Sequence, residues 1–369
     1  MIYIFISILI IYILTIGLLI YGFDKIEIIK IKDLQPKTNF SIIVPFRNEE
    51  NEFLNLLNSI SGLNYPKNIF EIVVVDDNSN DNSVAVFNKW QSENLEISSR
   101  LLQNIRKSNS PKKDAIQTAI SQIKNNWIIT TDADCFVQKN WLAYYNNVIQ
   151  GSNFEMICGA VSISNKKGYL NYFQLVDFLS LQGATIGSFG INKPFICNGA
   201  NFAYTKKLFI ELNGFDGNDK IASGDDVFLL QKAIKLFPEK VSYLKNQEVI
   251  VFTKPEEGWS KLFQQRVRWA SKTSSYDGFF GKYLAIIVFV MNLSLIVAFC
   301  LFSFAFCLLS FALKFIIDII LLNKTNRFIE NQKFIFPLIS GLFYPFWCVA
   351  VVLYSFFGCF EWKNRRYNK

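Results

Sequence analysis

The segment FEIVVVDDNS at Phe70–Ser79 combines an apolar run of strand length with two aspartates and a turn-forming Asn-Ser pair. Similar apolar runs occur on either side of it, FSIIVPF at Phe40–Phe46 and WIITTD at Trp127–Asp132. Between these runs, residues 51–60 and 111–123 have apolar side chains at helical spacing. Strands that alternate with helices predict an α/β domain, in which helices cover a mainly parallel sheet of the Rossmann type.

Aspartates gather at the ends of the predicted strands, within a domain that we expect to span residues 39–276. Asp76 and Asp77 end one strand, and Asp132 and Asp134 follow another. Ligands bind such sheets beyond the carboxyl ends of the strands. For Asp76 and Asp77, one interpretation is a turn and helix cap. The functional interpretation is a carboxylate that accepts hydrogen bonds from a uracil ring or a ribose.

The segment Asp132-Ala-Asp134 predicts a cation site. Residues two apart on a strand share a face, so both carboxylates can point at one ion. Mg or Mn prefers one or two protein carboxylates together with phosphate oxygens and water. A polar loop is the alternative. A second, weaker alternative is the nucleophile of a phosphatase D-x-D motif. Phe136 stands where that motif usually has Thr or Val.

A second acidic pair, Asp225-Asp226, stands at the expected start of a helix. Favourable charge at a helix N-terminus explains one carboxylate. Two adjacent carboxylates exceed that need, so we expect one of them to act as a general base, with a pKa raised by burial or by its neighbour.

Residues 257–276 contain WSKLFQQRVRWASK, which predicts an amphipathic helix at a membrane interface. Trp259, Leu262, Phe263 and Ala270 fall on one side. The opposite side holds Gln265, Arg268, Trp269 and Lys272. A membrane-surface helix with snorkelling cations explains this pattern. A functional interpretation places Arg268 beside a diphosphate and Trp269 against a sugar ring.

Composition excludes several classes of protein. The chain has 369 residues, of which 51% are hydrophobic and 18% charged, and it has 7 Cys and no His. The absence of His removes histidine-based zinc sites and Ser-His-Asp triads. The Cys residues show no paired C-x-x-C spacing, which argues against a disulfide framework. A metal here must therefore be held mainly by oxygen ligands, which favours Mg or Mn.

The first 23 residues, 1–23, have no charged side chain and are long enough to span about 30 Å of hydrocarbon as a helix. They lack the basic start and the small-residue cleavage site of a signal peptide, so we expect an uncleaved transmembrane anchor. Lys25, Lys30, Lys32 and Lys37 follow the anchor, which predicts a cytoplasmic location for the domain after it.

A second apolar region spans residues 283–359, and a basic tail at residues 360–369 follows it. The region predicts two or three membrane segments, and we expect three, with a break between residues 303 and 310. Lys314 and Asp318 interrupt its middle, so an interfacial helix is an alternative there. Basic residues beside membrane segments explain the net charge of +8 without a nucleic acid partner.

Taken together and in this order, the motifs resemble those of family 2 glycosyltransferases with a GT-A fold. The resemblance is to the membrane-bound group that includes ceramide glucosyltransferase and the cellulose, hyaluronan and poly-N-acetylglucosamine synthases. It covers residues 40–272. The matching segments are Val44-Pro-Phe-Arg-Asn-Glu49, Asp76-Asp-Asn-Ser79, Lys112, Asp132-Ala-Asp134, Asn198-Gly-Ala-Asn201, Gly224-Asp-Asp226 and Gln265-Arg-Val-Arg-Trp269.

The resemblance implies a role for each matching position. It places a divalent metal on Asp134 and Asp132, the catalytic base at Asp226 beside Asp225, and the acceptor side at Asn198, Gly199 and Asn201. It assigns binding of the nucleotide-sugar donor to Pro45, Arg47, Glu49, Asp76, Asp77, Lys112, Asp132, Gln265, Arg268 and Trp269.

The activity that the resemblance implies is transfer of a sugar from a nucleotide diphosphate sugar, most simply a UDP-sugar, with inversion at the anomeric carbon. We expect the acceptor to be a membrane lipid or a glycan, and the protein to reside in a bacterial inner membrane with its catalytic domain in the cytoplasm. A processive polysaccharide synthase of the same family is an alternative. A nucleotidyltransferase, a non-catalytic sugar-nucleotide-binding scaffold and a channel are alternatives from other classes.

Overall fold

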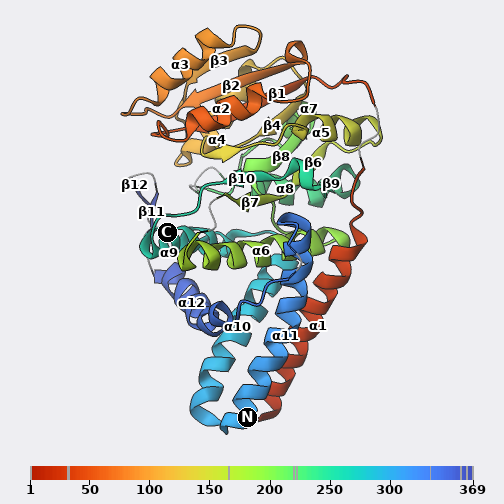
Figure 1. The fold of residues 1–369 in the computed structure, drawn as a ribbon, viewed down its shortest axis with the longest axis vertical. Coiled ribbons are helices and arrows are strands. Elements are labelled where there is room, and N and C mark those ends of the chain that lie inside the picture. Colours follow the sequence, from red (N-terminus) through yellow and green to blue (C-terminus); the bar gives the residue numbers. More distant parts are fainter. Residues whose placement is uncertain are drawn as a thin grey trace. The chain divides into compact units, whose positions relative to one another are not determined.

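The structure is a computed structural model that describes residues 2–30, 34–164, 167–218, 221, 223–332, 334–357, 360–362 and 365–367 (Figure 1). Side chains are described up to residue 356, apart from residue 274. Parts of the predictions lie outside the described residues. These parts are Met1 of the anchor, Lys32 after it, Lys333 and residues 358–359 of the second apolar region, and residues 363–364 and 368–369 of the tail.

The chain forms two compact units. The sheet unit consists of Glu27–Ser164 and Ile196–Lys254, and the helical unit consists of Met1–Ile26, Asn165–Phe195 and Pro255–Lys369. Residues 165–195 and 255–276, which lie inside the predicted 39–276 domain, therefore group with the apolar helices.

The sheet unit is built on a seven-stranded, mainly parallel sheet with the order β3-β2-β1-β4-β8-β6-β9, counted over the described residues (Figure 1). Strands β3, β2, β1 and β4 run parallel, as do β6 and β9, whereas β8 is antiparallel to both β4 and β6. The strands are β1 (Phe40–Phe46), β2 (Phe70–Asp76), β3 (Ser98–Gln103), β4 (Trp127–Thr130), β6 (Met156–Gly159), β8 (Phe202–Thr205) and β9 (Val241–Leu244).

Six α-helices and a small second sheet complete the described part of this unit. The second sheet has the order β5-β10-β7 and includes the residues just after the Asp132-Ala-Asp134 segment. Its strands are β5 (Cys135–Phe136), β7 (Val161–Ile163) and β10 (Val251–Thr253). The helices are α2 (Phe53–Ser61), α3 (Ser83–Glu93), α4 (Pro111–Gln122), α5 (Trp141–Gln150), α7 (Lys206–Glu211) and α8 (Asp225–Leu236), with short 3₁₀ turns η1 (Lys67–Ile69), η2 (Gly199–Asn201), η3 (Pro238–Lys240) and η4 (Gln247–Val249).

The apolar runs of the sequence account for the central strands of this sheet. Strands β1 and β2 are buried on both faces, as expected for central parallel strands, and their apolar runs pair in register from Phe40 opposite Phe70 to Phe46 opposite Asp76. Because parallel strands end at the same edge, the residues after β1, β2 and β4 are brought to one rim of the sheet. The predicted fold class, a mainly parallel α/β domain with apolar helices before and after it, is confirmed.

The helical unit contains four helices, among the described residues, that are long and apolar enough to cross a membrane. These are Ile2–Lys25, Phe279–Leu301, Phe304–Ile329 and Leu338–Phe356. The break between the second and third falls at Phe302 and Ser303, at the start of the predicted interval, and the Ser303 side chain caps the third helix. Apolar side chains such as Leu14 and Phe299 are 67% and 72% exposed, which suits contact with lipid rather than water.

The described elements of this unit are α1 (Ile2–Lys25), α6 (Tyr169–Gly190), α9 (Trp259–Ser271), η5 (Thr273–Ser275), α10 (Phe279–Leu301), α11 (Phe304–Ile329), α12 (Leu338–Phe357) and the two-stranded pairing of β11 (Phe360–Trp362) with β12 (Arg365–Tyr367).

Lys314 and Asp318 do not prevent α11 from packing as one long apolar helix. Their side chains form an ion pair of 2.8 Å, and the Lys314 side chain is 4% exposed. The Tyr12 hydroxyl of α1 donates to Asp318 Oδ1 at 2.7 Å. Pairing of this kind reduces the free energy needed to bury charge among apolar helices, so both residues point into the unit.

Helices α1 and α6 cross at glycines, which lets their backbones meet (Figure 1). A Cβ added at Gly187 of α6 would lie 2.3 Å from the Leu19 carbonyl oxygen, and one added at Gly22 of α1 would lie 2.1 Å from the Gly187 carbonyl oxygen. Neither contact is possible without moving a helix.

We expect Gly187→Ala to destabilise the protein, by about 1–3 kcal/mol, because overpacking at a backbone contact forces α1 and α6 apart. Gly17→Ala is the matched control, since a Cβ at Gly17 of α1 meets nothing within 4 Å. The control should be neutral or stabilising, because alanine favours helix over glycine by up to about 1 kcal/mol. Thermal unfolding of the full chain in detergent measures the stability of both variants. Equal unfolding midpoints for Gly187→Ala and Gly17→Ala would contradict the close crossing of α1 and α6.

Candidate active site

Lys112 stands at the centre of a cluster of carboxylates in the sheet unit. Its Nζ lies 2.6 Å from Asp132 Oδ1 and 3.6 Å from Asp225 Oδ2. Lys112 belongs to the first turn of α4, Asp132 follows β4, and Asp225 begins α8. Three predicted site residues from distant parts of the sequence therefore meet at the rim of the sheet.

Asp226 and Gly199 join the same cluster. The Gly199 backbone N–H donates to Asp226 Oδ2 at 2.7 Å, and the Val227 N–H donates to Asp226 Oδ1 at 2.7 Å. A Cβ built on Gly199 would lie 3.1 Å from Asp225 Oδ2 and 3.3 Å from Lys112 Nζ, so the backbone here comes close to both charged groups. The predicted acceptor-side segment thus lies against the predicted base.

The start of α8 explains why two aspartates are tolerated there. Gly224 precedes the helix with φ 87°, a left-handed conformation that glycine adopts readily. Asp225 and Asp226 then occupy the first turn, where the helix dipole favours negative charge. Asp225 is buried, and Lys112 supplies the opposite charge that such burial needs.

Lys112 keeps its positive charge in this setting. Burial acts to lower the pKa of Lys112, but the carboxylates of Asp132, Asp225 and Asp226 outweigh burial and raise the pKa above its usual value. In this state the lysine neutralises carboxylates that would otherwise repel one another.

Asp132, Asp134 and Cys135 have ligand atoms that all lie within 4.8 Å of one another. The Asp134 carboxylate is oriented by Thr253 of β10, whose Oγ1 lies 3.5 Å from Asp134 Oδ2, and by the Cys135 thiol, which lies 3.7 Å from Oδ1. Burial, reinforced by Asp134 and Asp132, raises the pKa of the Cys135 thiol. The remaining carboxylate oxygens fit a hard cation such as Mg or Mn.

Asp77 lies at the carboxyl end of β2 in a network of polar contacts. Arg106 binds its carboxylate in a bidentate manner, with Nε–Oδ1 2.6 Å and Nη2–Oδ2 2.7 Å. Asn104 Nδ2 donates to Asp77 Oδ1 at 2.7 Å, and Arg47 Nη1 donates to the Asp77 carbonyl oxygen at 2.9 Å. Asp76 serves the adjoining turn, where its Oδ1 accepts the Ser79 N–H at 2.9 Å.

Pro45 lies near the end of β1, and Glu49 lies in the connection from β1 to α2, two residues after Arg47. Pro45 pairs with Val75 of β2, and the Glu49 carbonyl oxygen accepts the N–H groups of Glu52 and Phe53 at 3.1 and 2.9 Å. The predicted donor-binding residues of the sheet unit therefore share one rim, although their contacts with a donor stay a prediction.

The Asn201 side chain is held inside the sheet unit, and its place on the acceptor side stays a prediction. Asn201 is fully buried. Its Oδ1 accepts from Trp141 Nε1 and Tyr145 Oη at 2.9 and 2.8 Å, and its Nδ2 donates to the Ala160 and Val249 carbonyl oxygens at 2.7 and 2.8 Å. Both polar atoms of the Asn201 side chain therefore have partners within the sheet unit. Asn198 caps η2, where its side chain accepts the Ala200 N–H.

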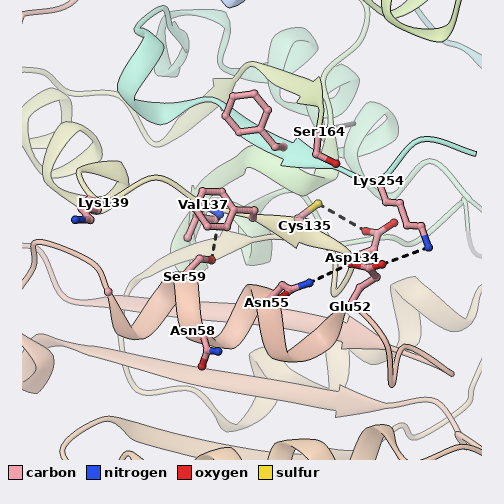
Figure 2. Close-up of a pocket in the computed structure, with 13 residues that line it drawn as sticks. Glu52, Asn55, Asn58, Ser59, Asp134, Cys135, Val137, Lys139, Ser164 and Lys254 are labelled. Atoms are coloured by element: carbon pink, nitrogen blue, oxygen red, sulfur yellow. Dashed lines mark hydrogen bonds and ion pairs between the residues drawn. The ribbon is translucent and has the colours of Figure 1, made fainter. Parts of the chain in front are cut away.

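A pocket of about 510 Å³ adjoins Asp134 and continues along α2 (Figure 2). Glu52 and Lys254 form an ion pair of 3.3 Å at its Asp134 end, and Asn55 Nδ2 donates to Glu52 Oε2 at 3.2 Å. These three residues belong to none of the sequence motifs described above. Figure 2 shows the side chains of Glu52, Asn55 and Lys254 grouped around Asp134.

Gln265, Arg268 and Trp269 belong to α9 of the helical unit. Leu262 and Val267 of this helix are buried in an apolar cluster with Phe173 and Trp347, and Phe263 and Ala270 pack against it, as the predicted amphipathic pattern requires. The observed helix ends at Ser271, within the expected 257–276 interval.

Arg106 and Thr253 are site residues that the sequence analysis missed. Arg106 follows β3, whose sequence SSRLLQ lacks the apolar run that identifies β1 and β2. Thr253 lies in a strand of three residues that pairs with β5 from a distant part of the chain. Neither has a local sequence signal.

Comparison with solved structures defines the class of this fold. The chain is similar to the mannosyltransferase PcManGT from Pyrobaculum calidifontis, solved in complex with GDP-Man and Mn2+, with a TM-score of 0.64 over 96% of this chain and 98% of that one. At 17% identity this similarity establishes the fold alone, which is of the GT-A type.

Sequence comparison gives the family. The sequence model described as glycosyl transferase family 2 matches residues 41–212, and that of glycosyl transferase family group 2 matches residues 127–360. The chain therefore belongs to the family 2 glycosyltransferases, which confirms the predicted family and the predicted enzyme class.

Two curated relatives share part of their length with this chain. The probable glycosyltransferase YdaM of Bacillus subtilis is 27% identical over 240 residues, which is 62% of this chain and 54% of YdaM. The poly-beta-1,6-N-acetyl-D-glucosamine synthase of Staphylococcus aureus is 25% identical over 254 residues, which is 68% of this chain and 57% of the synthase. The chain thus spans a little over half the length of these relatives.

Proposed function

We propose that this chain is an inverting glycosyltransferase that moves a sugar from a nucleotide diphosphate sugar to a membrane-associated lipid or glycan. The observation that supports this most is the cluster of Lys112, Asp132, Asp225 and Asp226 with the Gly199 backbone, next to Asp134. Membership of family 2 supplies the reaction class, and the cluster supplies the groups that such a transfer needs.

The donor diphosphate is proposed to bind between the Asp132-Ala-Asp134 segment and Arg47. Asp134 and Asp132 would hold Mg or Mn, and the cation, when bound, offsets the charge that develops on the leaving diphosphate. Lys112 lies 2.6 Å from Asp132 and adds a second positive charge at this edge. Asp77, Arg106 and Asn104 form the polar network that faces the nucleoside in this proposal.

Asp226 is the proposed general base. It removes the proton from the acceptor hydroxyl as the oxygen attacks the anomeric carbon. Its carboxylate is held by the backbone N–H groups of Gly199 and Val227, which fix its direction. A single base without a covalent nucleophile implies direct displacement, so an α-linked donor gives a β-linked product.

The acceptor is proposed to be a lipid, or a short glycan on a lipid, with the catalytic domain at the cytoplasmic face of the membrane. Four apolar helices support membrane association. Processive synthesis of a polysaccharide is the alternative, and the S. aureus relative is named a poly-beta-1,6-N-acetyl-D-glucosamine synthase. Gln265, Arg268 and Trp269 of α9 are proposed to contact the donor and the acceptor sugar.

One experiment names donor and acceptor together. The purified full chain in detergent is incubated with labelled UDP-sugars and GDP-mannose, with Mn²⁺ and with a lipid extract, and the products are analysed by mass spectrometry. We expect one sugar to appear on a lipid or lipid-linked glycan, with release of a nucleoside diphosphate. Release of inorganic diphosphate instead would identify a nucleotidyltransferase and refute the proposal.

A further inference from the structure

Two helices of the helical unit, α6 and α9, are joined by a buried ion pair outside the residues considered so far. Arg266 Nε of α9 lies 2.5 Å from Asp177 Oδ2 of α6, and the two side chains are 8% and 13% exposed. Arg266 occupies one of the variable positions of the segment Gln265-Arg-Val-Arg-Trp269, so the sequence motif gave it no role.

A second polar link joins α6 to the segment that leads into α9. The buried amide of Gln174 donates to the Glu256 carbonyl oxygen at 3.0 Å and accepts the Glu256 N–H at 2.9 Å. The Glu256 side chain in turn accepts from Gln265 Nε2 at 2.7 Å. Through Glu256, helix α6 therefore orients the first residue of the motif.

Arg266 also contacts the two ends of the motif directly. Its Nη1 donates to Gln265 Oε1, and its guanidinium carbon lies 4.2 Å from the centre of the Trp269 ring. Phe178 of α6 packs near the same indole, with ring centres 6.1 Å apart. One guanidinium thus binds a carboxylate, an amide and an aromatic face at the same time, which the planar fork of arginine allows and an ammonium group does not.

We propose that Asp177 and Gln174 of α6, together with Arg266, are positioning residues for the transfer reaction. They fix the side chains of Gln265 and Trp269 on α9 in the orientation that the donor and acceptor require. This inference rests on the proposed function of the motif. It assigns to α6, a helix without a recognised motif, the task of aligning α9.

The energetics indicate that the Arg266–Asp177 ion pair orients the side chains of α9 more than it stabilises the fold. A buried ion pair contributes little net stability relative to apolar residues of the same size, whereas the loss of one partner leaves a buried charge without compensation. Positioning groups of this kind affect the rate strongly, because a displacement of about 1 Å in a reacting group can lower the rate by about 100-fold.

The test compares Asp177→Asn and Arg266→Lys with Glu257→Gln, all in the full chain reconstituted in nanodiscs. Arg266→Lys keeps the charge opposite Asp177 but loses the contacts with Gln265 and Trp269. Glu257→Gln is the control, because it removes an exposed ion pair with Lys261 on the same helix. For each variant we measure kcat and donor KM, thermal unfolding, and hydrogen exchange in peptides that cover residues 259–271.

We expect kcat to fall by about 10- to 100-fold in Asp177→Asn and in Arg266→Lys, with a smaller change in donor KM. In Arg266→Lys this loss should occur without a change in thermal midpoint. Hydrogen exchange in α9 should be about tenfold faster in Asp177→Asn and unchanged in Glu257→Gln. Near-normal kcat in Arg266→Lys, or unchanged α9 exchange in Asp177→Asn, would overturn the inference.

The same experiment separates this inference from the proposed function. Absence of transfer by the wild-type chain with every donor would refute the function, and the exchange data would still decide whether Asp177 orders α9. Normal transfer by the wild-type chain together with unchanged kcat in both variants would refute only the positioning role.

Discussion

Asp226→Asn should abolish sugar transfer while donor binding persists. Asparagine cannot take up the acceptor proton, and general base catalysis contributes about 10²–10⁴-fold to a rate of this kind. Its amide oxygen can still accept one of the two backbone N–H groups, from Gly199 or Val227, that hold Asp226 in place. We therefore expect kcat to fall by about 10³-fold or more, with a donor affinity close to that of the wild-type chain.

The measurement combines steady-state transfer with calorimetric titration of the donor nucleotide. Glu239→Gln is the control, because it neutralises an exposed carboxylate on η3 of the same unit. Near-normal turnover in Asp226→Asn would remove this residue as the base. A parallel loss of donor binding would show that the carboxylate shapes the donor site instead.

Asp134→Ala should remove the dependence of donor binding on a divalent metal. We expect donor affinity in Mn²⁺ to fall by about tenfold or more, since one of the two carboxylate ligands and its charge are lost. The comparison with Cys135→Ser is decisive, because Cys135 is the third group within 4.8 Å. A hard cation takes oxygen ligands, so Cys135→Ser should keep both the affinity and the preference for Mn²⁺ or Mg²⁺.

Donor titrations with and without Mn²⁺ distinguish the two variants. Equal metal dependence in the wild-type chain and in Asp134→Ala would exclude this carboxylate as a ligand. Loss of binding in Cys135→Ser alone would instead indicate a softer metal held through sulfur.

The sequence predicts those parts of the fold that local patterns encode. The apolar runs of β1, β2 and β4 are long and end in polar residues, so their strands and the rim at which they end follow from the sequence. Two carboxylates of the site could be found for the same reason, because Asp132 and Asp134 follow β4. Asp226 could be found because an acidic pair stands at the start of an apolar-periodic helix, α8.

Contacts between distant segments could not be predicted in the same way. Arg106 binds Asp77 across 29 positions, and Asn201 bonds to four groups on three other segments. A lone arginine or asparagine in a loop has no periodicity, so tertiary packing alone decides whether it faces a ligand or the interior. The same holds for the glycine crossing of α1 with α6, and for the assignment of residues 165–195 to the helical unit.

The position of a bound metal tests the central claim most directly. Crystals of the full chain grown with Mn²⁺ and a nucleoside diphosphate would give an anomalous signal at the manganese absorption edge. We predict a single strong peak bonded to the carboxylates of Asp134 and Asp132 and to the diphosphate, with the nucleoside beside Asp77. A nucleotide bound elsewhere on the chain, with no manganese at these two aspartates, would contradict the account.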